Sequence, residues 1–445
     1  MRRADPALGA TLVIALAGAL CTATPATVRA QTAAAHTDTL SFRELLLAAE
    51  RTDPRQRQIE LLRSSSRLRL RSIDATRRPS LGLDGQAQYQ SDVTRIALAL
   101  PGVSVPVPPN DTYDAHLSAQ QSLIDPTLDS RRELERARLA ESEAAVRGTL
   151  FGLRQEVTDA FFGATVVQQR IAEVDAAIGD LEARLRETVA RYRNGAALRG
   201  DTASIAASII ERRQDRLALE SEHGAALARL SLLTGRTVSS DAVLVAPVTA
   251  PLASDVARAL DTTRARPEYE QFAASRERLA RESRLVSAQE KPRVSAFGRV
   301  GYGRPGLNLL SPDFQSYWVA GVQLHWAPFD WGTSERDREQ LSLQREIVAT
   351  NEAAFSRSLA RSVQPVLASI ARLDSTLALD ERVIALRQQV ASESQVQLRE
   401  GVVTAAVYVD RSTELLTARL RRVQHRVALE QARVNLLNTL GVEVR

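Results

Sequence analysis

The chain has 445 residues, of which 44% are hydrophobic and 25% charged, so it holds enough apolar material for a sizeable core. Aromatic residues make up only 4%, glycine and proline number 21 and 17, and Cys21 is the only cysteine. These values exclude a collagen-like rod, a disordered linker and a disulfide-stapled scaffold. The formal net charge of +5 is small and spread along alternating charges, so it does not indicate nucleic-acid binding.

Residues 1–30 have the organisation of a secretory signal peptide. Arg2 and Arg3 form a basic start, an apolar stretch over 11–20 is too short to span a bilayer, and Val28-Arg29-Ala30 resembles a cleavage site. A retained anchor helix is one alternative; lipidation of Cys21 is another, disfavoured by the large Leu20 before it. No later stretch offers the roughly 20 apolar residues of a membrane helix, so any bilayer crossing by the mature chain must use strands.

The rest of the chain repeats one plan. Asp53-Pro54 recurs as Arg266-Pro267 after 213 residues, and Gly195 recurs as Gly401 after 206. A period this long indicates a duplicated domain and not a solenoid. We predict a first repeat over 31–240 and a second over 241–445. Each contains a helix, a strand hairpin (79–123 and 292–327) and a long helical hairpin (127–235 and 332–441).

Four segments alternate apolar and polar residues with the period of two that is typical of strands. At about 10 to 11 residues, with one apolar face and aromatic residues near their ends, they have the length and pattern of membrane strands. A four-stranded sheet packed on helices in water stays open as the alternative. The apolar positions that we expect to face the membrane are Leu81, Leu83, Tyr89, Leu117, Val294, Val300, Trp318 and Val322.

Two long segments with heptad-like apolar spacing predict rods of helix. The first, Thr127 to Tyr192, contains no proline and at 1.5 Å per residue is roughly 100 Å long. The second, Gly332 to Leu398, is interrupted by Pro365, where we expect a local kink. Such rods need another long helix as partner. Four strands cannot close a barrel, and open edges in lipid leave backbone groups unpaired, so several copies of the chain must associate.

This order of elements resembles the outer membrane efflux proteins, the TolC-like family, over essentially the whole mature chain. The resemblance rests on the export signal, the early Asp53-Pro54 and Arg266-Pro267, the Pro-led strand hairpins and the Gly-containing helix turns. It implies a mainly α fold with a membrane β-barrel contribution. Four β-strands per chain enter a trimeric α/β-barrel tunnel, whose periplasmic part is made of long antiparallel coiled-coil helices.

The resemblance also implies a function. The homotrimer would be the passive exit channel of a tripartite efflux pump or type I secretion system, set in outer-membrane lipid, for small molecules or polypeptides. A periplasmic adaptor protein and an inner-membrane pump of RND or ABC type would be its partners. No catalysis and no cofactor is implied. An exported coiled-coil scaffold or adhesin without a channel is the alternative, although a scaffold would not need strand faces free of charge.

Two sets of functional residues follow from the resemblance. The family's constriction motif, Asp-x-x-Asp, falls on Val407 and Asp410, and the first repeat has Asp201 and Ser204 there, so each repeat keeps one carboxylate. A ring of Asp410 would bring like charges together and attract cations, whereas a solvated helix carboxylate is the alternative. The turns after the rods correspond to the periplasmic tips that contact the adaptor: Asn194, Gly195, Ala196, Ala197, Glu400, Gly401, Val402 and Val403.

Enzyme signatures are weak throughout the sequence. The segment 301–306 fits a dinucleotide-binding pattern, but Pro305 argues against the helix that the pattern requires. The five histidines are scattered without the spacing of metal ligands. The sequence therefore predicts neither a catalytic nor a metal site, and the energy for transport would come from the partners.

Overall fold

The computed structural model describes residues 39–94, 107–247, 249, 265–308 and 311–443. The predicted signal peptide and Cys21 lie outside the described residues. Within this part, the chain is mainly helical and contains a two-stranded and a four-stranded sheet.

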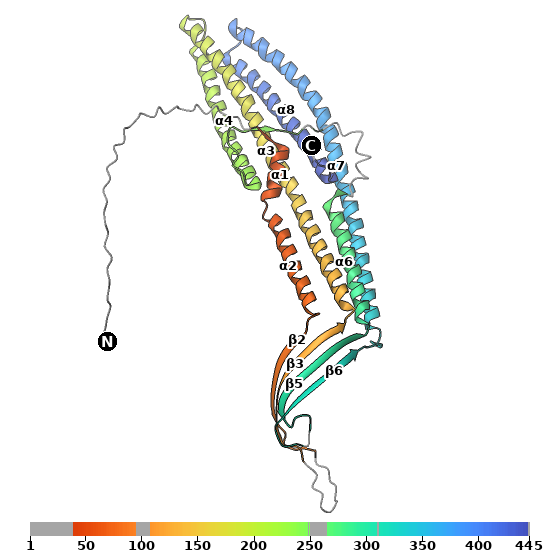
Figure 1. Ribbon diagram of the computed structural model, residues 1–445. Coiled ribbons are helices and arrows are strands. Elements are labelled where there is room, and N and C mark those ends of the chain that lie inside the picture. Colours follow the sequence, from red (N-terminus) through yellow and green to blue (C-terminus); the bar gives the residue numbers. More distant parts are fainter. Residues whose placement is uncertain (1–38, 95–106, 248, 250–264, 309–310, 444–445) are drawn as a thin grey trace, which may run out of the picture. The chain divides into compact units, whose positions relative to one another are not determined.

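Both halves of the chain present the same order of elements (Figure 1). The first half contains α2 (Arg55–Ala75), β2 (Ser80–Tyr89), β3 (Asp111–Ile124), α3 (Thr127–Arg193) and α4 (Arg199–Thr234). The second half contains α6 (Pro267–Gln289), β5 (Arg293–Arg304), β6 (Gln315–His325), α7 (Thr333–Arg399) and α8 (Ala405–Leu440). Three short elements are added: β1 (Thr39–Ser41), α1 (Phe42–Thr52) and β4 (Val243–Val245). This order is what a duplication would produce, and the exact repeat boundaries stay a prediction.

The two long helices match the rods predicted from the sequence. α3 and α7 span 67 residues each, and each end lies within one residue of the predicted rod. α7 continues through Pro365, so this proline does not end the helix. α3 packs along α4 and α7 along α8, while contacts of α3 with α8 and of α6 with both long helices join the two hairpins. None of the helices in the described residues is both long enough and apolar enough to cross a membrane.

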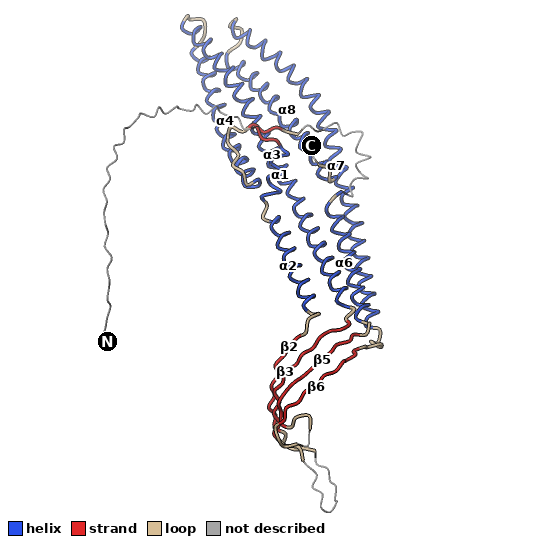
Figure 2. The backbone as a smooth tube through the Cα atoms, viewed as in Figure 1, coloured by secondary structure: helices blue, strands red, loops and turns tan. Residues whose placement is uncertain are grey.

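The four-stranded sheet has the order β2-β3-β5-β6, with every neighbouring pair antiparallel. Figure 2 shows these strands gathered apart from the helices, and within the described ranges no helix packs along either face of the sheet. The alternative of a sheet packed on helices in water is therefore wrong. Both faces of the sheet are open to whatever surrounds the chain.

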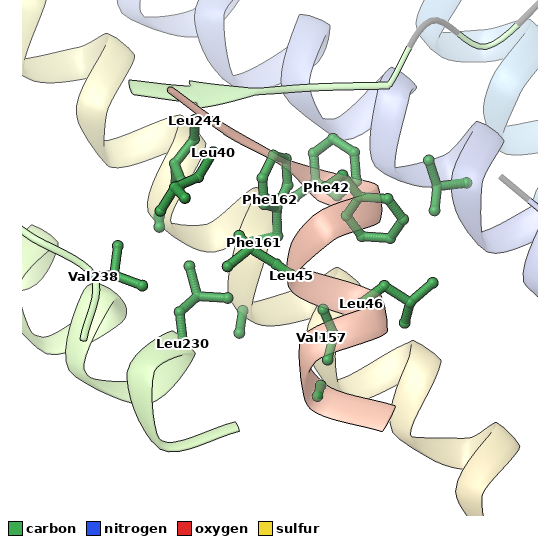
Figure 3. Close-up of a cluster of buried hydrophobic side chains, with 14 of the residues drawn as sticks. Leu40, Phe42, Leu45, Leu46, Val157, Phe161, Phe162, Leu230, Val238 and Leu244 are labelled. Atoms are coloured by element: carbon green, nitrogen blue, oxygen red, sulfur yellow. The ribbon is translucent and has the colours of Figure 1, made fainter. Parts of the chain in front are cut away.

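The main hydrophobic core lies where α1, α3, α4 and α8 meet the small parallel sheet of β1 and β4 (Figure 3). Phe42 on α1 packs edge-to-face on Phe161 of α3, with ring centroids 5.3 Å apart, and also contacts the ring of Phe162. Burial of such rings dominates core energetics, so this cluster fixes α1 and the sheet against the long helix. α1 begins with a capping box in which Ser41 and Glu44 each accept from the other's backbone amide.

Candidate functional surfaces: the strand sheet and the helix tips

All eight predicted membrane-facing residues lie on one face of the four-stranded sheet. The pairs Leu83–Leu117, Leu117–Val300 and Val300–Trp318 form a continuous row across the four strands. Leu83 is 82% exposed and Trp318 is 73% exposed. Val294 pairs with Leu324, and Val322, Leu81 and Tyr89 share the same parity.

This face carries no charged side chain over most of its length. The first charges, Arg304 and Asp111, stand at the end of the sheet far from the helices and pair with each other at 2.8 Å. An exposed, contiguous apolar surface of this kind marks an interaction site, since monomeric soluble proteins rarely expose one.

The opposite face is polar and holds a hydrogen-bonded network that joins β3 and β6. The His116 ring nitrogen Nδ1 lies 2.6 Å from Asp114 Oδ2, and Tyr317 donates its hydroxyl to the other oxygen of Asp114. Gly301 makes room for this network, because a Cβ there would lie 2.7 Å from the His116 Cβ. Sequence reasoning assigned the polar parity but missed the network, which depends on cross-strand register.

Three hollows follow one another along the polar face. Their volumes are about 650, 490 and 290 Å³, and they are lined by residues of β2, β3, β5 and β6. Among the described residues, no group of three His, Cys, Asp or Glu side chains is arranged to hold a metal ion. The polar face is thus a hollowed surface suited to water and solutes.

The two helix turns use one backbone motif. Gly195 and Gly401 have φ of +73° and +72°, the left-handed conformation that favours glycine. After Gly195, the amide of Ala196 donates to the Arg191 carbonyl at 2.8 Å; after Gly401, that of Val402 donates to the Gln397 carbonyl at the same distance. Both patterns satisfy the last carbonyls of the long helices, as in the Schellman motif.

Side chains tie the two turns to each other. Arg191 Nη1 donates to the Leu398 carbonyl at 2.7 Å, so α3 caps the end of α7. Six of the eight predicted tip residues line a groove of about 350 Å³ between the turns: Gly195, Ala196, Ala197, Gly401, Val402 and Val403. Asn194 and Glu400 do not line it. The structure therefore brings most of the predicted tip residues together on one surface.

The two predicted constriction carboxylates have different surroundings. Asp410 is exposed on α8, and no ion pair or hydrogen bond of its side chain is formed within the described part of the chain. Asp201 Oδ2 accepts from the Leu198 amide at 3.1 Å, and Oδ1 accepts from the Ala405 amide at 2.9 Å. Asp201 thus holds the first turns of α4 and α8 together, whereas the Asp410 carboxylate has no such partner within the described residues.

Sequence reasoning missed Tyr408, which lies two residues before Asp410. Its side chain is 2% exposed, and its hydroxyl donates to Asp180 Oδ2 on α3 at 2.7 Å. Burial raises the pKa of Tyr408 well above its ordinary value, and the hydrogen bond to Asp180 adds to this effect. The phenol stays protonated at neutral pH and fixes α8 against α3.

Apolar side chains also lie unpartnered on α7. Leu379, Val383 and Leu386 recur at coiled-coil spacing, and Leu386 is 65% exposed. The heptad signal was present in the sequence, but it does not separate contacts within a chain from contacts between chains. These residues form a second surface that favours association.

No protein-family model matches the sequence, and no curated protein sequence is similar to it at a significant level. Solved structures do match. The channel protein CusC has a TM-score of 0.64 and 16% identity, covering 90% of this chain and 92% of that chain. The outer membrane protein VceC of Vibrio cholerae has a TM-score of 0.63 and 16% identity, covering 91% and 97%.

The open state of the MtrE outer membrane channel of Neisseria gonorrhoeae also matches, with a TM-score of 0.63, 17% identity and coverage of 91% and 89%. At these identities the similarity shows the fold alone. The fold is that of TolC-like outer membrane channels, so the resemblance found in the sequence is confirmed at that level.

Proposed function

We propose that this chain, which has the fold of TolC-like outer membrane channels, is a passive exit channel of an efflux or type I secretion system in the outer membrane. The observation that carries the proposal is the four-stranded sheet. One of its faces is apolar and exposed, the other is polar and hollowed, and no helix in the described residues covers either. A sheet of this kind separates hydrocarbon from water.

The energetics support lipid as the partner of the apolar face. Full burial of a Leu, Val or Phe side chain stabilises by about 1.5–3 kcal/mol, and this face presents several such side chains, among them Leu81, Leu83 and Val322. In water, the same surface would drive aggregation. The alternative of a soluble scaffold or adhesin offers nothing to cover it.

Unpaired strand edges and the apolar stripe on α7 support association of several copies of the chain into an oligomer. β2 and β6 each pair on one side only within the described part of the sheet. An unpaired strand edge in lipid leaves backbone groups unsatisfied, which closure by further copies removes. The apolar stripe on α7, with Leu379 and Leu386, would then pack against a neighbouring copy. The stoichiometry of three is taken from the family resemblance.

The groove between the helix tips is the proposed contact for a periplasmic adaptor. The two turns contribute small and apolar residues to its lining, among them Ala196, Ala197 and Val402, and Arg191 and Asp201 add charged groups beside them. An RND or ABC pump would supply the energy, and would select the small molecules or polypeptides that leave through the channel. Asp410, exposed near the tips, is the proposed constriction carboxylate. Asp201 remains a candidate for this role, although its two hydrogen bonds favour a structural one.

The proposal is tested by extracting the protein from membranes and measuring heat-modifiable migration as a trimer, followed by conductance in planar bilayers. A matched pair of variants on one strand sharpens the test. Leu83→Arg places a charge on the apolar face and should reduce the amount of trimer in the membrane. For a residue near the bilayer midplane, the expected loss of stability of the inserted protein is about 2–4 kcal/mol. Gln86→Arg, on the polar face of the same strand, should assemble as the wild type does. A soluble monomer, or equal behaviour of the two variants, would contradict the proposal and favour the scaffold.

A further inference from the structure

The largest of the three hollows described on the polar face lies at the end of the sheet nearest the helices. Its volume is about 650 Å³, and its lining comes from the end of α2 and from all four strands. Arg293 on β5 pairs in register with His325 on β6, and Ser122 pairs with Ser295, which places these side chains on the polar face. Arg78, just before β2, completes the cationic lining.

The cations of this hollow have no carboxylate partner. Within the described ranges, neither Arg78 nor Arg293 forms an ion pair, and His325 forms none either. The lining itself contains no carboxylate, and two carboxylates close to it in sequence or pairing are engaged elsewhere: Glu290 pairs with Arg338 at 2.6 Å, and Asp129 pairs with Arg77, the neighbour of Arg78, at 3.0 Å. The two guanidinium charges are therefore not neutralised by the chain itself.

The positive charge is local to this hollow. The next hollow along the same face contains both Asp84 and Arg299, so its charges are balanced. The third contains Asp114 together with Arg299 and Arg304, and Arg304 is paired with Asp111. The unpaired positive charge of Arg78 and Arg293 is thus confined to the hollow at the junction between the helices and the strands.

We propose that this hollow is a binding site for anionic groups, such as carboxylate, phosphate or sulfonate, on solutes that pass along the polar face, and that it favours anions at this level. The inference rests on the proposed channel function. Guanidinium groups bind such anions bidentately, and the hydroxyls of Ser80, Ser122 and Ser295 supply further donors. A cleft lined by one sign of charge concentrates the opposite ion, and rings of Arg select anions in pores.

The test compares ion selectivity of the purified full-length protein in planar bilayers under a potassium chloride gradient. In the double variant Arg78→Gln/Arg293→Gln, the chloride-to-potassium permeability ratio should fall about two-fold or more. Arg78→Lys/Arg293→Lys keeps the charges and should retain the ratio. Arg43→Gln/Arg51→Gln removes two exposed charges from α1 and is the matched control, with no change expected.

A second measurement uses inorganic phosphate as the probe. Phosphate should reduce the chloride current of the wild type, and should do so less in Arg293→Gln or Arg78→Gln alone, which keeps the inference testable if the double variant does not assemble. A conducting double variant with the selectivity of the α1 control would overturn the anion site and leave the channel intact. A wild type that does not conduct would instead overturn the proposed function.

Discussion

Replacement of Asp201 by asparagine tests how the two helix tips are held together. Asp201 is the third residue of α4, and its carboxylate accepts from the amide of Leu198, the N-cap of that helix. Its second oxygen accepts from the amide of Ala405, the first residue of α8. The equivalent position in α8 is Val407, which cannot cap, and Thr404 makes no side-chain cap either. One carboxylate therefore serves the N-termini of both helices.

The magnitude follows from these two contacts. A hydrogen bond to a charged group contributes about 1.5–3 kcal/mol, and a negative charge at a helix N-terminus about 0.3–1 kcal/mol. In the Asp201→Asn variant, the new side chain would keep one acceptor oxygen, turn an amide NH₂ towards the other donor and lose the charge at both helices. We expect a local loss of about 2–3 kcal/mol, which corresponds to roughly 30- to 150-fold faster amide exchange at the affected N-terminus.

The assay is hydrogen exchange followed by mass spectrometry on the detergent-solubilised protein, in peptides that cover Leu198 and Ala405. Asp410→Asn is the matched control: Asp410 lies one turn into α8 without a partner in the described part of the chain, so the exchange of the same peptides should not change. Unchanged exchange in Asp201→Asn together with altered conductance would refute the capping argument. That result would instead support Asp201 as a constriction carboxylate.

Three further outcomes follow from the surroundings of Tyr408, His223 and Asp410. Tyr408→Phe removes the 2.7 Å hydrogen bond to Asp180, so peptides containing either residue should exchange about tenfold faster, whereas Tyr192→Phe, exposed at the tip, should change nothing. His223 is 8% exposed, and burial lowers its pKa from the ordinary 6.5, so its contribution to stability is present above that pH and is lost as pH falls. The melting temperature should therefore drop less between about pH 7.5 and 5.5 in His223→Leu than in the wild type, and equal drops would exclude this histidine as the cause. Asp410→Ala should weaken the block of channel current by Mg²⁺, and identical traces would remove Asp410 from the constriction.

Local signals in the sequence were sufficient for the long helices and for the four strands of the larger sheet, but not for the short elements β1, α1 and β4. Pro126 and Gly195 bracket α3, and the long helix between them ends within one residue of the prediction. Alternation with a period of two placed Leu83, Leu117, Val300 and Trp318 on one face, because cross-strand pairing keeps parity. Both signals depend only on residues close together in the sequence, so they can be recognised without knowing the tertiary contacts.

The contacts that define the sites have no such local signal. Asp201 and Ala405 are separated by 204 residues, and Tyr408 and Asp180 by 228. Their pairing depends on how two helical hairpins lie side by side, which periodicity does not reveal. The family motif placed a carboxylate at position 201, and only the geometry shows that backbone amides already occupy it. Likewise, nothing in the sequence distinguishes Arg78 and Arg293 from the other arginines. Only the structure shows that neither of them forms an ion pair within the described residues.

The two charged sites proposed here lie at opposite ends of the long helices. α3 spans 67 residues, which at 1.5 Å per residue is roughly 100 Å, about ten times the screening length in 0.1 M salt. The electrostatic interaction of Asp410, near the tips, with Arg78 and Arg293, at the junction of helices and strands, is therefore screened to a negligible value. A solute would meet them in series, first a level that holds cations and then one that holds anions. Because distant sites act independently, removal of either charge should leave the selectivity due to the other unchanged.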